Sequence, residues 1–293
     1  MLILFPSDYF NLKKLDPEYQ AEYEAVTRLP NVEILLFNYD GFVSGESIKL
    51  YPKEYYTRAC IYRGWMLTHA QYSTLYEFLN NNGIALINTP DEYNRCHLFP
   101  SVREILGPDT PQSLCYEHGS PIDWDKVNST FKKFMIKDYV KSVKETDFPV
   151  YFETPVDPEE MEVRIAEFMD YRGNLYTGGI VLKEFVDFKK YGQCTNEYRA
   201  FFLYGKLLSV SRNANQPDSC PFVPHDFCMR FSTLMSNYYT VDFGELADGR
   251  WIVIETGDGQ VSGLSPGQIF FKYYEEMQLI VDNHTDTTKK TLL

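Results

Sequence analysis

The sequence predicts a protein of mixed α/β and α+β class, in which a small parallel-sheet domain precedes two α+β subdomains. Three observations lead to this prediction. Over residues 1–100, short apolar runs alternate with helical segments, as in βαβ units. Residues 100–130 are rich in Pro, Ser, Gly and Asp, which indicates a loop with a short helix at a domain change. From Gly178 onward, short turns join the apolar runs, as in antiparallel hairpins.

We expect the first domain to span residues 1–100 and the second 101–293, with a change of subdomain near residue 175. In the first domain, the predicted strands cover residues 2–5, 32–37, 59–62 and 84–88, and the predicted helices cover 17–27 and 70–80. Open sheets of this kind bind ligands near the carboxyl ends of their strands. Residues 63–65, Arg-Gly-Trp, follow the third strand, so they either face a ligand or pack under a turn.

In the second region, a strand ends at Lys137 and continues into a loop that carries Lys141 and Lys144. A helix over residues 157–171 is predicted because Asp157 can act as its N-cap, a proline follows, and the first turn is acidic. The remaining predictions are strands over residues 179–188, 197–204 and 206–211, a helix over most of 221–237, and a last helix near 266–282.

Residues 239–255 are the most informative segment. Asp248-Gly249 separates two alternating apolar runs, which is a strong signal for a β-hairpin. With these two residues as the turn, Asp242 lies opposite Glu255 on the same face of the sheet. Two like charges at opposed positions are destabilising, and a divalent cation with oxygen ligands is the natural compensation. The alternative is a solvated pair at a strand edge.

The composition excludes several classes of protein. The chain has a formal net charge of −13, which argues against a general binder of nucleic acid or of anionic membranes, although one locally basic pocket remains compatible with it. Its 6 cysteines show no CxxC spacing and are expected to be reduced thiols of a cytoplasmic protein. No apolar run approaches the ~18 residues of a membrane span, so no membrane association is expected.

Four basic residues lie in apolar strands or at their ends: Lys137, Lys183, Arg199 and Arg212. Cations in such runs are rarely buried without an anionic partner, and one structural salt bridge for each is the simplest alternative. Beside a paired-carboxylate site, however, the four together favour a polyphosphate with its metal. Arginine suits phosphate through its fork of donors, and lysine supplies a point charge. The sequence contains neither the P-loop motif nor the GxGxxG motif.

Several features therefore occur in a fixed order: Lys137 before a loop, Lys183-Glu184-Phe185-Val186, Glu197-x-Arg199, Arg212, Asp242 and Glu255. This ordered set resembles the ATP-grasp superfamily, most closely its divergent clade marked by two arginines and a lysine. The resemblance covers roughly residues 100–280. It implies that two α+β subdomains clasp ATP between them and that the N-terminal strands form the pre-grasp domain that precedes such folds.

The resemblance also implies a role for each residue. Lys137 and Lys183 would contact the phosphates of ATP. The backbone of residues 184–186 (Glu184, Phe185 and Val186) would read the adenine edge, with the Glu184 side chain near an adenine amino group or the ribose. Asp242 and Glu255 would hold Mg²⁺, and Arg199 and Arg212 would stabilise the transferred phosphoryl group and the acyl phosphate.

Two departures from the family pattern leave alternatives open. The closing metal motif, Glu-x-Asn in many relatives, is Glu255-Thr-Gly257-Asp258 here. Either Asp258 supplies the third ligand, or a second metal is lost. The usual Gly-rich phosphate loop is replaced by a segment in which Lys141 and Lys144 either bind phosphate or form a solvated face.

The resulting hypothesis is an ATP-dependent carboxylate–amine ligase that acts through an acyl phosphate on small-molecule or peptide substrates, with nucleic acid not expected as a partner. One alternative is an ATP-binding assembly factor without ligase activity, because the clade includes proteins that help to assemble a translation-initiation complex. Another is a small-molecule kinase. The substrates are set by loops of the first domain and around residues 213–226, and the sequence does not identify them.

Overall fold

The computed structural model describes residues 1–54, 59–143 and 146–291. Its N-terminal part is built on a sheet of order β4-β3-β1-β5-β6, in which β2 also pairs with β1. The strands are β1 (Leu2–Asp8), β2 (Asn11–Leu15), β3 (Glu33–Phe37), β4 (Leu50–Tyr51), β5 (Ala59–Tyr62) and β6 (Ala85–Leu86). β1 is parallel to both β3 and β5, and β5 is parallel to β6. The parallel sheet predicted for this region is therefore confirmed.

The apolar run that forms β1 explains why this strand is central. Leu2 and Leu4 pack into one core cluster, and Ile3 and Phe5 pack into another, so both faces of the strand are buried. The helices of this part are α1 (Gln20–Val26), which follows a 3-10 turn at Pro17–Tyr19, α2 (Tyr39–Val43) and α3 (His69–Asn81). α3 begins at a capping box in which Thr68 accepts a hydrogen bond from the N–H of Gln71.

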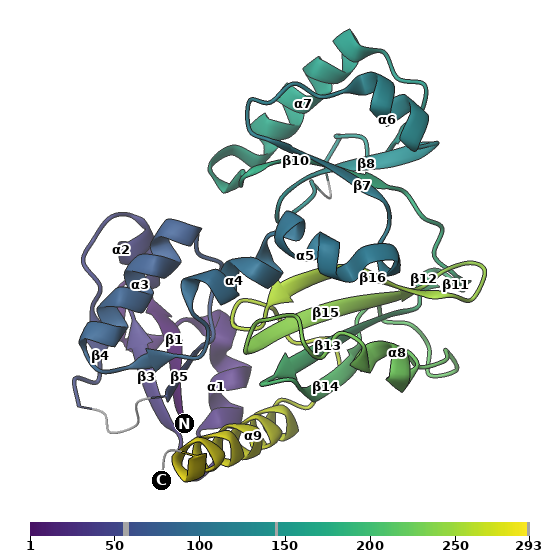
Figure 1. The fold of residues 1–293 in the computed structure, drawn as a ribbon. Coiled ribbons are helices and arrows are strands. Elements are labelled where there is room, and N and C mark those ends of the chain that lie inside the picture. Colours follow the sequence, from purple (N-terminus) through teal and green to yellow (C-terminus); the bar gives the residue numbers. More distant parts are fainter. Residues whose placement is uncertain (55–58, 144–145, 292–293) are drawn as a thin grey trace.

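Two helices lead from the N-terminal part to the rest of the chain. α4 (Pro90–His97) and α5 (Phe99–Leu106) both contact β16 (Trp251–Asp258), a strand of the C-terminal sheet. In Figure 1 they lie between the N-terminal strands and that sheet. A short 3-10 turn, Gly107–Asp109, ends the connection. The loop with a short helix that was predicted over residues 100–130 contains more regular structure than expected, namely most of α5, the strand Ser113–Glu117 and the helix Trp124–Thr130.

The second sheet has the order β7-β10-β8-β9, with antiparallel pairing throughout. Its elements are β7 (Ser113–Glu117), α6 (Trp124–Thr130), β8 (Lys133–Asp138), β9 (Phe152–Glu153), α7 (Pro158–Arg172), a 3-10 turn (Gly173–Leu175) and β10 (Gly179–Glu184). α7 begins at the predicted Asp157 cap, whose side chain accepts from the N–H of Glu160. This lobe stands apart at the top of Figure 1, with α6 and α7 on the outer side of its sheet.

The third sheet has the order β14-β13-β15-β16 and is also antiparallel. A two-stranded ribbon, β11 (Lys190–Tyr191) and β12 (Cys194–Thr195), precedes it. Its other elements are β13 (Glu197–Leu203), β14 (Lys206–Arg212), α8 (His225–Met229), β15 (Tyr238–Glu245) and α9 (Phe270–Thr291). α9 contacts both β14 and α1, and so joins the C-terminal sheet to the first domain. β10 pairs within the second sheet, so the chain passes from the second sheet to the third after Glu184.

The helix expected over most of residues 221–237 is wrong in extent, because α8 covers only His225–Met229. Pro224 acts as its N-cap and Arg230 as its C-cap, and further along the chain Met235 adopts a positive φ of 58°. Within the described residues, no helix has the length and apolar character that crossing a membrane requires.

The predicted opposition of Asp242 and Glu255 is confirmed, although the turn differs from the expected one. Leu246 and Arg250 close the loop, which therefore has three residues instead of two. A bulge at Ile254 compensates for the extra residue, because the register shifts between Asp242 and Phe243. The two carboxylates consequently share a face despite the longer loop.

Candidate functional site

A cavity of about 840 Å³ is lined by residues of the second and third sheets. β8 and β10 contribute Lys137 and Lys183, the segment after β10 contributes residues 184–188, and β16 contributes Ile254 and Glu255. The cavity thus lies where the chain passes from one sheet to the other, and most of the predicted site residues meet around it.

Lys137 and Lys183 are two buried cations on the cavity side of the second sheet. Lys137 pairs with Val181, so it shares a face with Lys183 two residues further along β10. The two residues are 6% and 5% exposed, and their ammonium groups lie 5.4 and 4.5 Å from the centre of the Phe99 ring. Burial, and secondly the charge of Lys137, lower the pKa of Lys183 to about 7. Burial also lowers the pKa of Lys137.

The bulge in β16 provides the hydrogen-bond acceptor for one of these lysines. Ile254 is the residue left unpaired by the register shift, and its carbonyl accepts a hydrogen bond of 2.6 Å from Lys183 Nζ. The lysine of one sheet is therefore held against the strand of the other, beside Glu255. The bulge thus gives the buried ammonium group a neutral acceptor on the far side of the cavity.

Residues 184–186 also line the cavity. The N–H of Glu184 donates to Gln112 O at 2.8 Å, and the N–H of Phe185 donates to Lys133 O at 2.9 Å. Within the described part of the chain, the N–H of Val186 has no such acceptor. The Phe185 ring packs against Tyr151, with ring centres 5.1 Å apart, and adds an apolar surface at this end of the cavity.

Lys141 extends from a tight turn towards Glu255, and the two charged groups are 3.7 Å apart. Asp138 holds the turn, because its carboxylate accepts from the N–H groups of Val140 and Lys141 at 2.7 and 2.6 Å. Asp138 also pairs with Arg172 at 2.8 Å. Sequence reasoning overlooked Asp138, although an aspartate just before a turn is a recognised signal. Lys144 lies outside the described residues.

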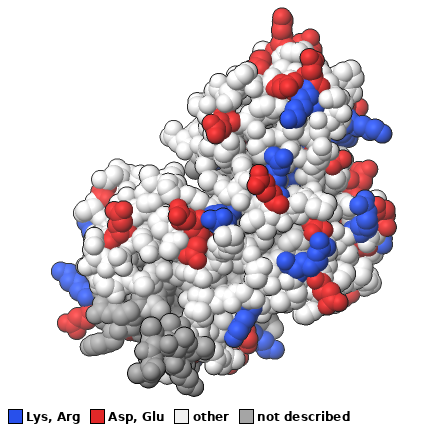
Figure 2. All heavy atoms as spheres, in the orientation of Figure 1, with Lys and Arg blue, Asp and Glu red and all other residues white. Residues whose placement is uncertain are grey.

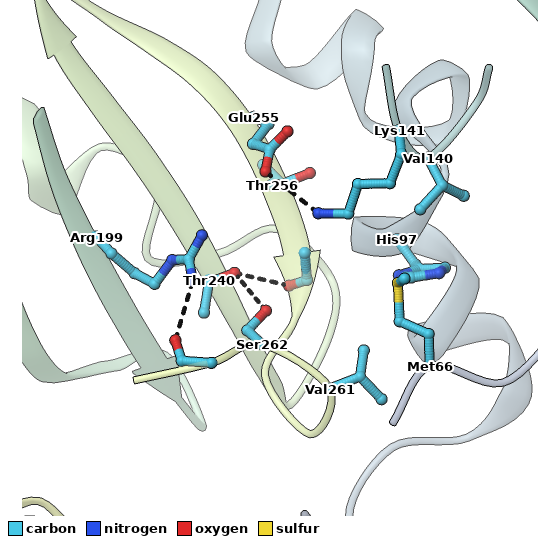
Figure 3. Close-up of a pocket in the computed structure, with 12 residues that line it drawn as sticks. Met66, His97, Val140, Lys141, Arg199, Thr240, Glu255, Thr256, Val261 and Ser262 are labelled. Carbon is cyan, nitrogen blue, oxygen red and sulfur yellow. Dashed lines mark hydrogen bonds and ion pairs between the residues drawn. The ribbon is translucent and has the colours of Figure 1, made fainter. Parts of the chain in front are cut away.

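Arg199 and Asp242 form a bidentate ion pair between β13 and β15. Arg199 Nε donates to Asp242 Oδ1 at 2.8 Å, and Nη2 donates to Oδ2 at 2.6 Å. Nη1 donates to the Gly263 carbonyl at 2.9 Å, a bond that Figure 3 shows. Burial raises the pKa of Asp242, and the adjacent guanidinium opposes that rise.

A second, smaller cavity of about 80 Å³ is lined by the residues drawn in Figure 3. Lys141 and Glu255 line both cavities, so they lie at the junction. Arg199, Thr240 and His97 line only the smaller one. The sequence carries no signal for His97 at this site, because a single histidine outside any motif indicates only a surface or core residue. Burial and the charges of the nearby lysines lower its pKa to about 4.

Residues 123–277 match a model of the ATP-grasp domain, namely that of family 3 in the clade marked by two arginines and a lysine. This match covers more than half of the chain. The chain belongs to this clade of the ATP-grasp superfamily. No curated protein sequence matches it.

Solved structures of ATP-grasp ligases share the fold. A D-alanine–D-alanine ligase from Coxiella burnetii is 11% identical with a TM-score of 0.63, over 99% of this chain and 97% of that one. The corresponding ligase from Bacillus anthracis in complex with ATP is 14% identical, with a TM-score of 0.60 over 99% and 98%. The D-cycloserine synthetase DcsG is 12% identical, with a TM-score of 0.60 over 94% and 98%. The predicted pre-grasp and ATP-grasp architecture is therefore confirmed.

Two of the predicted ATP-grasp site residues lie elsewhere. Asp258 is three residues beyond Glu255 on β16, so its side chain is on the opposite face of the sheet. There its buried carboxylate accepts hydrogen bonds from Asn88 and Gln260, and burial raises its pKa to about 7. We therefore do not count Asp258 among the candidate metal ligands.

Arg212 is also turned away from Arg199. It pairs with Tyr198, the neighbour of Arg199 on β13, and so lies on the other face of the sheet. Its guanidinium lies 4.8 Å from the ring centre of Phe222 and 3.1 Å from Asp218, beside a separate cavity. The structure brings one of the two predicted catalytic arginines to the carboxylate pair.

Arg63, which follows β5, is a structural residue rather than a ligand-facing one. It is 1% exposed, pairs with Glu22 at 2.9 Å, and donates to carbonyls of Gly259, Gln260 and Ser262. It thereby fastens the loop after β16 to the first domain of this ATP-grasp protein.

Proposed function

We propose that the protein is an ATP-dependent carboxylate–amine ligase that acts through an acyl-phosphate intermediate. The observation that carries this proposal is the convergence of three lysines on one cavity in a chain of net charge −13. Lys137, Lys141 and Lys183 all line the cavity, and two of them are buried without a carboxylate in hydrogen-bond contact among the described residues. Buried cations arranged in this way need an anion, and the phosphates of a nucleotide supply it.

The dimensions and lining of the cavity support a nucleotide. About 840 Å³ is within the usual range of roughly 300–1,000 Å³ for small-molecule sites. The apolar surface of Phe185 suits the base, and the N–H of Val186 is a suitable donor to the edge of adenine. The lysines at the other end suit the phosphates, which would then lie beside Glu255.

The residues fit a magnesium ion that arrives with the nucleotide. Among the described residues, no group of three or more His, Cys, Asp or Glu side chains could hold a metal by itself. Mg²⁺ bound to nucleotide phosphates, however, usually takes only one or two protein carboxylates. Glu255 lies at the junction of the two cavities and can supply one. Bound there, the ion would neutralise charge on the phosphates.

The chemistry follows from this placement. A substrate carboxylate attacks the γ-phosphorus, the bond from that phosphorus to the β,γ-bridging oxygen breaks, and ADP leaves. An amine then attacks the acyl carbon and inorganic phosphate leaves, while the amine loses its proton to solvent or a nearby base. The remaining N–H groups of Arg199 suit the charge that develops on the phosphoryl oxygens, and the lysines hold the nucleotide in place.

Small molecules and peptides are the proposed substrate classes. The similar solved structures include a D-cycloserine synthetase, and also the ligase PsnB in complex with a minimal precursor. PsnB is 14% identical with a TM-score of 0.57. Figure 2 shows acidic and basic side chains interspersed on one face of the molecule, without a continuous basic surface. Nucleic acid is accordingly not proposed as a substrate.

Calorimetry of ATP binding with and without Mg²⁺ tests this assignment. The parent chain should bind ATP more tightly with Mg²⁺, and Glu255→Gln should lose that dependence. Glu104→Gln, an exposed change on α5, is the matched control and should behave as the parent does. Equal metal dependence in the parent and Glu255→Gln would place the metal ion away from Glu255 and contradict this assignment. Release of ADP that requires both a carboxylate and an amine would then establish ligation.

The assembly-factor alternative is favoured by one surface feature. Tyr9 and Phe10, at the turn between β1 and β2, are 71% and 91% exposed and pack edge-on against each other, with ring centres 4.7 Å apart. Such exposed aromatic residues are typical of contact surfaces. A defined stable complex that is lost in Phe10→Ser, formed by a protein that binds ATP without turning it over, would support this function instead.

A further inference from the structure

We propose that Arg199 takes the place of a second metal ion, so that the site binds a single divalent cation, at Glu255, with each nucleotide. This inference rests on the proposed function, because it presupposes that the metal enters with a nucleotide. It distinguishes the two carboxylates that the sequence alone treats as equivalent ligands. Asp242 is neutralised by the buried side chain of Arg199. Glu255 is partly solvated, so that the ion can reach it.

The first argument is that Asp242 is fully engaged. Both of its carboxylate oxygens accept from Arg199, at 2.8 and 2.6 Å, and the third bond of the guanidinium, to Gly263 O, fixes its orientation. The two side chains are 17% and 9% exposed, so little solvent competes for the pair. A metal ion that bound to Asp242 would have to displace the Arg199 guanidinium and would then lie beside this positive charge.

The second argument is steric and concerns Gly257. This residue is two positions beyond Glu255 on β16, on the same face, where a further ligand would have to project. A Cβ atom at Gly257 would lie 2.9 Å from Ser262 Oγ and 3.0 Å from Thr240 Oγ1. These two hydroxyls hydrogen-bond to each other at 3.0 Å (Figure 3), so the space for a ligand side chain is already filled.

The third argument is that Glu255 remains accessible to a cation. Its side chain is 33% exposed and faces both cavities. The ion pair with Lys141 is long, at 3.7 Å, and Lys141 is itself 44% exposed. A partly solvated pair of this kind is weak, so a divalent ion bound to nucleotide phosphates can replace the lysine. Lys141 would then turn to the phosphates in the same cavity.

Manganese binding, followed by electron paramagnetic resonance, tests the stoichiometry directly. Mn²⁺ is titrated into protein with the non-hydrolysable analogue AMP-PNP, at a protein excess that leaves no free nucleotide. We expect one Mn²⁺ per bound AMP-PNP in the parent chain. Arg199→Gln, which keeps a polar side chain but releases the Asp242 carboxylate, should bind two. Arg250→Gln removes the arginine of an exposed Arg–Asp pair in the same hairpin and should still bind one.

The outcomes separate this inference from the proposed function. Two Mn²⁺ ions per nucleotide in the parent would overturn the inference and leave the nucleotide site intact. A single ion in a folded Arg199→Gln protein would overturn the role given to Arg199. Failure of AMP-PNP to bind the parent at all would overturn the proposed function itself. If Arg199→Gln does not fold, Arg199→Lys is the alternative variant, because it keeps one positive charge beside Asp242 and should still bind one Mn²⁺. Two Mn²⁺ ions in Arg199→Lys would contradict the inference that a positive side chain takes the place of the second metal ion.

Discussion

Replacement of Lys183 by methionine is the perturbation that tests the nucleotide site most directly. Methionine matches the length of the stem and removes the ammonium group, which is buried against Phe99 and Ile254 O. Burial, and secondly the charge of Lys137, lower the lysine pKa from its usual 10.5 to about 7 in the protein, which corresponds to roughly 5 kcal/mol against the charged form. Phosphate in the cavity would reverse that penalty, because an adjacent anion favours the charged form.

This reversal predicts proton uptake when the nucleotide binds. At pH 8, a lysine with a pKa of about 7 is roughly 10% charged, so recharging it in the complex takes up about 0.9 proton. At pH 6 the lysine is already about 90% charged, and the uptake falls to about 0.1 proton. Above pH 7, the affinity for nucleotide should accordingly fall by up to about tenfold per pH unit.

Calorimetry in buffers of different ionisation enthalpy measures this uptake for Mg²⁺ with AMP-PNP. The parent and an exposed-lysine control, Lys126→Met on α6, should show the uptake at pH 8, and Lys183→Met should not. The nucleotide's own protonation is common to all three proteins and cancels in the comparison. Equal uptake in the parent and Lys183→Met, or none in the parent at pH 8, would refute the assignment of this lysine to the phosphates.

The lowered pKa of Lys183 also predicts how the free energy of unfolding depends on pH. The folded-state pKa of Lys183 lies below the unfolded value, so the unfolded chain binds more protons between about pH 7 and pH 10.5. The lysine therefore lowers the free energy of unfolding by its full amount below pH 7. This destabilisation decreases as the pH rises from about 7 to 10.5. Lys183→Met should be more stable than the parent without nucleotide at pH 6, by up to roughly 5 kcal/mol. The difference should narrow towards pH 10, as measured by urea unfolding.

Three further changes test the packing around the site. Arg172→Leu leaves the buried carboxylate of Asp138 unpaired and should lower the free energy of unfolding by about 3–5 kcal/mol in urea titrations; a loss below about 1 kcal/mol would show that the pair is not structural. Arg63→Leu removes the partner of another buried carboxylate and should cost a similar amount, with protease cleavage in the loop after β16 as a second readout. Gly257→Ala should cost about 1–3 kcal/mol by overpacking, and Ser262→Gly in the same chain should recover most of it.

The sequence predicted the fold well where one periodicity dominated. The strand at residues 59–62 matches β5, and the helix from the Asp157 cap is α7, because a continuous apolar run or an N-cap followed by proline leaves little ambiguity. The prediction failed at α8, which is much shorter than the helix expected over most of residues 221–237. There the chain is shaped by Pro224 and by packing under the third sheet.

The sequence predicts those site residues that lie at the ends of recognisable strands. Lys137, Lys183 and residues 184–186 lie where two adjacent strands deliver them, so their convergence followed from local pattern and family resemblance. Asp138 and His97 could not be found in this way. The first acts by holding a turn, and the second is carried by α4, an element of a different part of the fold.

The roles of the two arginines depend on strand register, which the sequence does not specify. Opposed carboxylates such as Asp242 and Glu255 can be neutralised either by a metal ion or by a cation from the next strand. Here β13 pairs with β15 so that Arg199 lies opposite Asp242, and β14 pairs with β13 so that Arg212 lies opposite Tyr198. Because side chains alternate between faces, a shift of one residue between β13 and β15 would turn Arg199 away from Asp242. A shift of one residue between β13 and β14 would bring Arg212 to the face of Arg199. In the proposed single-ion site, the number of ions that the acidic pair takes would therefore depend on the pairing of β13, a strand distant in the chain, and not on the acidic residues alone.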